Sequence, residues 1–254
     1  LPKTISSPIG AAITYLRILG AENDIDPVDA FSEIKHINSD HDAYFEGCLP
    51  MLHLMGDAHN LFDLKNTRSS IFELFKRFNI KTGSIPGFSC PSKGLLDFKS
   101  ENMRNIVAKI SEKNLKAYKR ANPKKMIIGS PEAFVSFSSD NNYKNVTSVV
   151  DEFLNSLKKN KGLHKIKRTV ALHKSCRMEN DPFYDSTKEL LKEIPGLNVI
   201  ELEGNCGHNN FNKIDGESKQ KAMDLLNDAA EKGIDTIICT SPYCESHLLM
   251  CTRE

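Results

Sequence analysis

The chain has 254 residues, of which 39% are hydrophobic and 26% are charged, as is ordinary for a globular protein of one large or two modest domains. Its formal net charge of +1 gives no electrostatic argument for binding nucleic acid or an anionic membrane, and no apolar run approaches the roughly 20 residues of a membrane-spanning helix. The seven cysteines are an odd number in a chain too large to need disulfides, so they indicate a reducing compartment and a role as ligands, redox groups or core residues.

Residues 1–40 are predicted to form an N-terminal docking segment outside the two lobes described below. The spacing of four apolar residues predicts a short helix that docks on the body of the protein or on a partner: Ala12, Tyr15, Leu16 and Leu19. Because the chain begins at Leu1, with neither a methionine nor a signal-peptide pattern, we expect further sequence upstream.

Residues 41–160 alternate predicted strands with predicted helices. The strands are predicted at 43–46 and 126–128, and apolar spacing predicts helices around 71–78, at 102–120 and at 146–157. The first strand leads to Cys48, and a short segment after the first helix leads to Cys90. This alternation predicts a lobe with a small, mainly parallel sheet, and the lysine-rich stretch at 158–167 is its predicted boundary.

Residues 165–254 repeat this pattern, with predicted strands at 169–172, 198–202 and 236–238 and predicted helices at 189–193 and 217–232. Each predicted strand is followed by at least one cysteine. Cys176 and Cys206 lie in the loops after the first and second strands, and Cys239 and Cys244 follow the third strand. Parallel strands joined by right-handed crossovers bring their carboxyl ends to one edge of the sheet, where ligands bind. We therefore expect these cysteines at one edge.

The two halves resemble each other around their third strands. The strand at 126–128 is followed by Ser130-Pro131, and the strand at 236–238 is followed by Ser241-Pro242, but only the second half then supplies a cysteine, Cys244. This similarity predicts an internal duplication with one degraded site. The predicted fold is α/β, with two pseudo-repeated lobes, each a small, mainly parallel sheet flanked by helices.

The cysteines of the second lobe are candidate ligands of an iron–sulfur cluster, which needs about four converging thiolates. Cys176, Cys206 and Cys244 supply one thiolate from each loop, and Cys239 is the best fourth candidate, although a packing role for Cys239 in the core stays open. Cys48 and Cys90 are a weaker candidate for a second site. Zinc is an alternative metal, and a redox dithiol is disfavoured because no Cys-x-x-Cys occurs.

Two histidines near these cysteines are further candidates. His208 follows Cys206-Gly207 and can act as a cluster ligand or a proton donor, or simply form local hydrogen bonds in the loop. His173 lies three residues before Cys176 and can act as a ligand or, by strand alternation, face the core.

Three segments of the second half resemble the cysteine-rich "CCG" domain: His173-Lys174-Ser175-Cys176, Asn205-Cys206-Gly207 and Ser241-Pro242-Tyr243-Cys244. This domain occurs, typically duplicated, in heterodisulfide reductase B subunits and in relatives such as glycolate oxidase iron–sulfur subunits. The steps of 30 residues from Cys176 to Cys206 and 38 residues from Cys206 to Cys244 are similar to the family's spacing. In the first half, Gly47-Cys48 and Ser89-Cys90 resemble the family's Gly-Cys and first Cys-Cys-Gly.

The chain departs from the family's motif at several cysteines. Asn205 and Ser241 replace two cysteines of the second copy, and in the first copy the replacements are Ser89, Ser130 and Ala133. In heterodisulfide reductase B subunits each complete motif supplies five thiolates to a non-cubane cluster, whereas this chain has three matching thiolates in the second copy and two in the first. One smaller or conventional cluster, such as 4Fe-4S, with Cys239 as fourth ligand is what the residues allow. The chain also stops shortly after Cys244, where the family continues, so we expect a missing tail.

The resemblance implies an iron–sulfur oxidoreductase subunit of a multi-subunit complex. Its implied partners are a ferredoxin-like C subunit and a flavin-containing A subunit, and its implied substrate is a disulfide, a thiol or a quinone-linked partner. The implied location is cytoplasmic, with membrane association through partners. The alternative is a cluster-free or zinc-stabilised structural subunit, which the missing cysteines favour.

Overall fold

The computed structural model describes residues 41–47, 64–88, 101–159, 163–176, 178–208 and 216–252. These residues form two compact units. The first comprises the described residues up to Gly129 together with Ala133–Thr147, and the second comprises Ser130–Glu132 and the described residues from Ser148 onward. The expected helix in residues 1–40 and the candidate ligands Cys48 and Cys90 lie outside the described residues.

The sheet of the first unit has the strand order β2-β1-β3-β4. Its strands are β1 (Asp42–Phe45), β2 (Thr82–Gly83), β3 (Met126–Ile128) and β4 (Val146–Ser148), and its helices are α3 (Leu64–Arg77), α4 (Glu101–Ala121) and α5 (Pro131–Ser138). The central strand β1 pairs in parallel with β2 and with β3. Its core joins apolar residues of these strands to helix residues such as Ala117 and Phe137.

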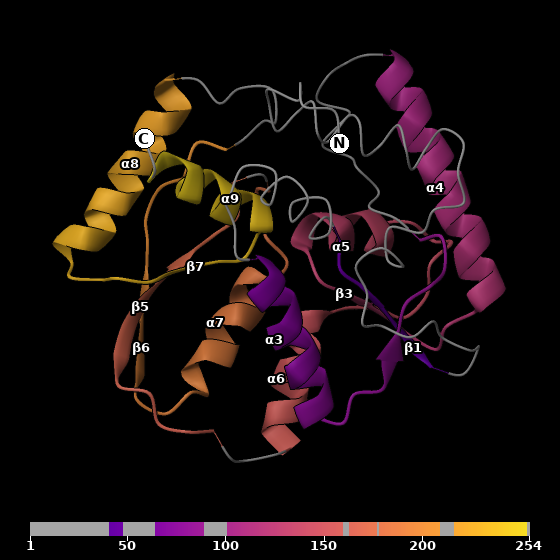
Figure 1. Cartoon of the computed structure of the whole chain (residues 1–254), viewed down its shortest axis with the longest axis horizontal. Coiled ribbons are helices and arrows are strands. Elements are labelled where there is room, and N and C mark those ends of the chain that lie inside the picture. Colours follow the sequence, from indigo (N-terminus) through magenta and orange to yellow (C-terminus); the bar gives the residue numbers. More distant parts are fainter. Residues whose placement is uncertain are drawn as a thin grey trace. The chain divides into compact units, whose positions relative to one another are not determined.

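The sheet of the second unit has the strand order β6-β5-β7, and both pairings are parallel. In chain order the elements are α6 (Val149–Lys159), β5 (Arg168–His173), α7 (Tyr184–Lys192), β6 (Leu197–Glu201), α8 (Gly216–Glu231), β7 (Ile237–Cys239) and α9 (Pro242–Cys251). The chain moves from β5 to one neighbour and then crosses to the other, so right-handed crossovers put α7 and α8 on opposite faces. Figure 1 shows the two helices on either side of this sheet.

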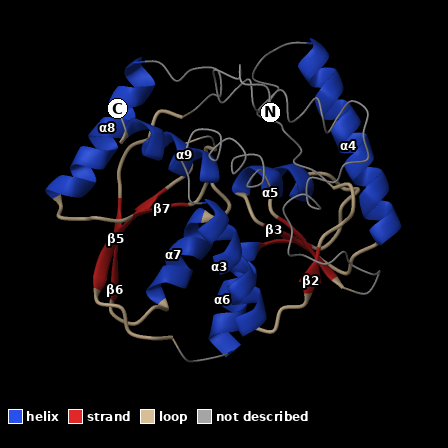
Figure 2. Cartoon of the chain, viewed as in Figure 1, coloured by secondary structure: helices blue, strands red, loops and turns tan. Residues whose placement is uncertain are grey.

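The two sheets share the arrangement of their first three strands, which confirms the predicted α/β fold with two pseudo-repeated lobes. In each sheet the first strand is central and the second and third lie on either side of it, as β2-β1-β3 and as β6-β5-β7. Each third strand leads into a helix with a proline in its first turn, Pro131 in α5 and Pro242 in α9. Figure 2 shows this repeated alternation of strands and helices.

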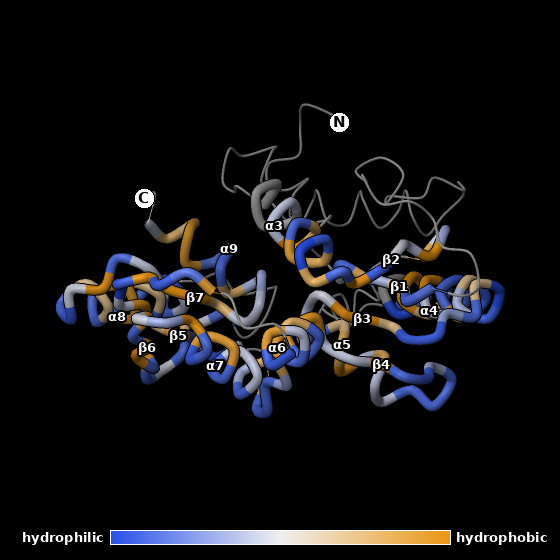
Figure 3. Tube along the Cα trace, turned by 90° about the horizontal axis from the view of Figure 1, so that it is seen from below, coloured by the Kyte–Doolittle hydropathy of each residue, from blue (hydrophilic) through white to orange (hydrophobic). Residues whose placement is uncertain are grey.

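Hydrophobic patterning explains why these segments form these elements. The strands β3 and β7 consist of apolar residues and cysteine, and Figure 3 shows both in orange. Helix α8 carries apolar residues at helical spacing, and Ala222, Leu225 and Ala229 are buried against the second sheet's core. The helix predicted at 217–232 is therefore confirmed.

The predicted helix at 146–157 differs from the structure at its start. Val146 lies in β4, and α6 begins at Val149 because the Ser148 hydroxyl accepts a hydrogen bond from the Asp151 amide (2.9 Å). Helix α6 then packs on α7 of the second unit, where the Ser186 hydroxyl donates to the Asp151 carboxylate. Apart from Ser130–Glu132, the second unit begins at Ser148. The boundary predicted at the lysine-rich stretch 158–167 stays a prediction.

None of the helices in the described ranges is both long and apolar enough to cross a membrane.

Candidate metal centre

Three cysteines of the second unit meet at the carboxyl edge of its sheet. Cys176 lies in the loop after β5, Cys206 in the loop after β6, and Cys244 in the first turn of α9, which follows β7. Cys206 and Cys244 are fully buried, and Cys176 is half-buried. The predicted convergence of these three residues is therefore what the parallel sheet produces.

His173, the last residue of β5, joins the three cysteines. One nitrogen of His173 and the sulfur atoms of Cys176, Cys206 and Cys244 all lie within 4.8 Å of one another. His173 Nε2 lies 3.3 Å from Cys176 Sγ, and Cys176 Sγ lies 3.1 Å from Cys206 Sγ. The second unit therefore offers four converging donor atoms, three of them sulfur.

The contacts among the thiols perturb their protonation. The side chains of Cys206 and Cys244 contact Cys176 Sγ, and the Cys206 amide donates to that sulfur at 2.9 Å. These hydrogen bonds lower the pKa of the Cys176 thiol, and the contact with Cys176 raises the pKa of the Cys206 thiol. The contacts therefore favour the thiolate form of Cys176, the form in which cysteine binds metals.

Asp181 connects the loop after β5 to the loop after β7. Its buried carboxylate accepts hydrogen bonds from the amides of Ser175 (3.0 Å) and Phe183 (2.9 Å) and from the Thr240 hydroxyl. Ser175 immediately precedes Cys176, and Thr240 follows β7 on the way to Cys244. Sequence reasoning missed Asp181, since a single aspartate before a proline carries no motif.

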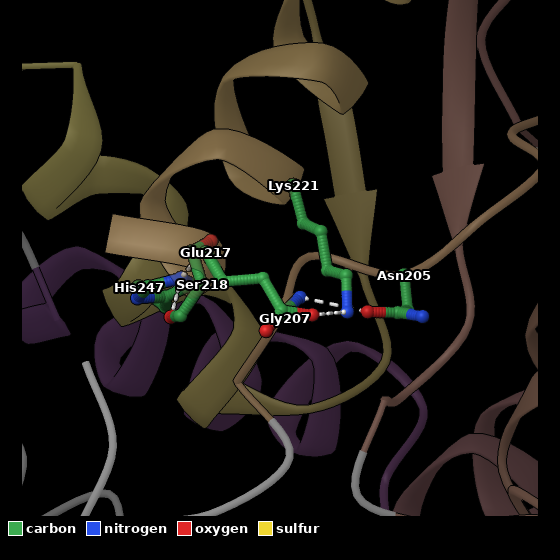
Figure 4. Close-up of polar contacts among 6 residues, drawn as sticks. All are labelled: Asn205, Gly207, Glu217, Ser218, Lys221 and His247. Carbon is green, nitrogen blue, oxygen red and sulfur yellow. Dashed lines mark hydrogen bonds and ion pairs between the residues drawn. The ribbon is translucent and has the colours of Figure 1, made fainter. Parts of the chain in front are cut away.

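Gly207 holds the Cys206 loop against the start of α8. A β-carbon at Gly207 would lie 2.6 Å from the carbonyl oxygen of Ser218, and its backbone has a positive φ of 81°. Figure 4 shows Gly207 beside Ser218, whose hydroxyl lies 3.1 Å from His247 Nε2. Because His247 is on α9, this contact joins the helix that carries Cys244 to α8.

Burial lowers the pKa of the His247 imidazole. Its ring stacks on that of His208, with 5.1 Å between the ring centroids. His208 in turn donates from Nδ1 to the Tyr243 carbonyl (3.0 Å). His208, a candidate ligand from the sequence, is not one of the four converging groups found among the described residues.

The two residues that replace family cysteines form hydrogen bonds with the backbone. The Asn205 side chain accepts from the Gly207 amide at 3.0 Å, which folds the loop around Cys206. Ser241 is the N-cap of α9, and its hydroxyl accepts from the Tyr243 amide at 3.3 Å. Both substitutions thus position a neighbouring cysteine instead of adding a thiolate.

Cys239, the fourth ligand predicted from the sequence, ends β7 directly beside His173 in the register of the sheet. Its sulfur is not one of the four donor atoms within 4.8 Å, and it packs against the apolar core of the second unit. Burial raises the pKa of the Cys239 thiol well above its usual value. Cys251 is likewise buried in this core.

The donor chemistry fits an iron–sulfur centre. Thiolates are the usual ligands of such clusters, and imidazole replaces thiolate in some of them. The five thiolates of the family's complete motif are not matched, because Asn205 and Ser241 stand in two of the five places. The four converging groups therefore suit a centre with four protein ligands.

Comparison with known proteins supports this chemistry. Residues 170–249 match the model of the CCG family, described as a cysteine-rich domain. The matched stretch lies within the second unit. All four converging residues lie inside the matched stretch, which confirms the resemblance stated from the sequence for the second lobe.

A stretch of 105 residues is 29% identical to the probable iron–sulfur-binding oxidoreductase FadF of Bacillus subtilis (strain 168). The match covers 39% of this chain and 15% of that relative, so the chain spans a small part of the relative's length. No solved structure matches the chain. The cysteine-rich domain, this relative and the four donors together support an iron–sulfur redox role.

Proposed function

We propose that this chain is the iron–sulfur redox subunit of a heterodisulfide-reductase-like complex, in which Cys176, Cys206 and Cys244 are thiolate ligands of one cluster. The observation that carries the proposal is the convergence of these three thiols, each from a different loop, inside the cysteine-rich domain. A fourth donor completes the ligand number of a conventional cluster such as 4Fe-4S.

In this proposal the cluster relays electrons to or from a disulfide, a thiol or a quinone-linked partner. Reduction of a disulfide consumes two electrons and two protons and yields two thiols, so a one-electron cluster would pass the electrons singly. A flavin-containing A subunit and a ferredoxin-like C subunit are the proposed electron carriers on either side. We propose a cytoplasmic complex, because the odd number of cysteines suits a reducing compartment.

The test is the content of iron and acid-labile sulfide in protein purified without oxygen, together with its visible spectrum. We expect stoichiometric iron and sulfide in the parental chain and a loss of most of both in Cys206→Ser, because serine removes a buried ligand. Cys251→Ser is the matched control, since Cys251 is also buried in the second unit but is not among the converging donors. A parental protein without iron, or equal loss in both variants, would contradict the proposal.

One observation favours a second candidate, a zinc-stabilised structural subunit. Donors bound to one tetrahedral zinc ion lie about 3.8 Å apart for two sulfurs, whereas the thiolates of a four-iron cluster bind separate irons and lie farther apart. The spacing within 4.8 Å is similar to that around a single ion. In the same experiment this candidate requires one zinc per chain, no labile sulfide and a colourless protein.

A further inference from the structure

Two neighbouring residues could supply the fourth ligand of the candidate centre. His173 and Cys239 end adjacent strands and are partners in the register of the sheet. Both are therefore close to the loops that carry Cys176, Cys206 and Cys244. Sequence spacing favoured Cys239, because four thiolates are the usual ligand set of a cluster.

Geometry favours His173. If the centre holds a single tetrahedral ion, a bound nitrogen and a bound sulfur lie about 3.5 Å apart, as follows from metal–ligand bonds of about 2.0 and 2.3 Å. In a cluster the ligands bind separate irons, and the requirement is that the four donors face one point. His173 Nε2 lies 3.3 Å from Cys176 Sγ, and a His173 nitrogen is within 4.8 Å of all three sulfur atoms. Cys239 is one of the described residues, but its sulfur is not part of this group.

The burial of His173 is a second, independent indication. The side chain is 0% exposed, and its Nδ1 has no hydrogen-bond partner among the described residues. Burying an imidazole with incomplete hydrogen bonding is unfavourable unless another interaction offsets the loss of hydration. Its other nitrogen, Nε2, lies 3.3 Å from Cys176 Sγ, so a metal held by that sulfur would be within reach of Nε2, and the bond to the metal would offset part of the cost of burying the ring.

We propose that His173 is the fourth metal ligand, through Nε2, and that the centre has a donor set of three cysteines and one histidine. The inference rests on the proposed metal centre and names its ligands. Cys239 is then a partly buried residue that packs against the core. A neutral imidazole in place of a thiolate makes the centre less negative by one charge, so it raises the reduction potential of an iron–sulfur cluster.

The test compares His173→Gln, His173→Cys and Cys239→Ser, with the parental chain labelled with ¹⁵N-histidine. Pulsed electron paramagnetic resonance of the reduced centre measures the coupling of the unpaired electron to a bound nitrogen. We expect strong nitrogen coupling in the parental chain and in Cys239→Ser. His173→Gln should lose the coupling and most of the metal, and His173→Cys should keep the metal, lose the coupling and have a lower midpoint potential.

The inference is overturned if His173→Gln keeps its metal and its spectrum, or if Cys239→Ser loses its metal. His173→Cys guards against a folding defect, because it restores a fourth donor at the same position. If the parental chain holds zinc instead of iron, the proposed function fails while the ligand set is still tested. Cobalt(II) then replaces zinc, and the cobalt spectrum must change in His173→Gln and stay the same in Cys239→Ser. A parental chain that binds no metal contradicts both proposals.

Discussion

At Gly207 a side chain would meet backbone atoms of the next helix. The added β-carbon would lie 2.6 Å from the Ser218 carbonyl oxygen and 2.8 Å from Ser218 Cα. The backbone atoms of Ser218 cannot move aside in the way that the end of a flexible side chain can. The loop or α8 must therefore shift. The shift would displace Cys206, which is the adjacent residue.

We therefore expect Gly207→Ala to destabilise the protein and to weaken metal binding. The positive φ alone costs about 1–3 kcal/mol, and the overlap with α8 adds to this. Gly204→Ala is the matched control: Gly204 lies in the same loop with a φ of 93°, but its β-carbon would have no atom within 4 Å. The midpoint temperature of thermal unfolding and the metal content should both fall clearly further in Gly207→Ala than in Gly204→Ala. Equal effects in the two variants would mean that the close approach to Ser218 is unimportant.

At the scale of elements, Asp181 holds two loops of the sheet's carboxyl edge together. One of its carboxylate oxygens accepts from both the Ser175 amide and the Thr240 hydroxyl, and the other accepts from the Phe183 amide. An asparagine has one acceptor oxygen, and its NH₂ group would face an N–H donor on one side. The loop that carries Cys176 and the loop that leads to the helix of Cys244 would then lose a shared anchor.

Asp181→Asn should lower the metal affinity by roughly 10–100-fold, as is typical when a residue that orients metal ligands is changed. It should also lower the free energy of unfolding by about 1–3 kcal/mol, because a buried donor loses its partner. Glu179→Gln is the control, since Glu179 is an exposed residue of the same loop and its substitution removes the same charge. Competition titrations with a chelator measure the affinity. An unchanged affinity in Asp181→Asn would rule out its role in positioning the ligands.

Elements with strong local patterns were predictable from the sequence. The strands β5, β6 and β7 and the helix α8 were found within a few residues of their ends, because runs of apolar residues and helical spacing are local signals. Helix α9 was not predicted, since its ten residues are largely buried and apolar on several sides, so they show no amphipathic spacing. Helix α7 begins at Tyr184, five residues before the predicted start at Glu189.

The candidate site was predictable only in part, because some of its residues meet through contacts that no local sequence pattern indicates. Three of its four converging groups, Cys176, Cys206 and Cys244, follow from strand order, because parallel strands end at one edge. The fourth converging group is His173 and not the predicted Cys239. The difference depends on the direction of the side chains at the ends of two paired strands, and the spacing of residues in the sequence does not show that direction. Asp181 and His247 act through contacts between distant segments, such as the contact of His247 with Ser218, 29 residues away.

At the scale of the whole molecule, the two units have separate hydrophobic cores. The core of the first unit includes Phe45, Ile128 and Phe137, and the core of the second includes Ala171, Leu225 and Leu248. Two of the four donors, Cys206 and Cys244, belong to the second core itself. A metal bound by them would add its binding free energy to the folding of the second unit.

We expect removal of the metal to loosen the second unit selectively. A ligand that binds only the native state stabilises it by about 2.7 kcal/mol at 100 times its dissociation constant, and stripping the metal removes this contribution. Amide hydrogen exchange should therefore become faster in β5, β7 and α9 after anaerobic treatment with a chelator. Exchange in β1, β3 and α4 should change little, because those elements belong to the first unit. In Cys206→Ser the chelator should have no effect on the exchange rates, since that variant has already lost the centre. Equally faster exchange in both units of the parental protein would contradict a structural role of the metal confined to the second unit.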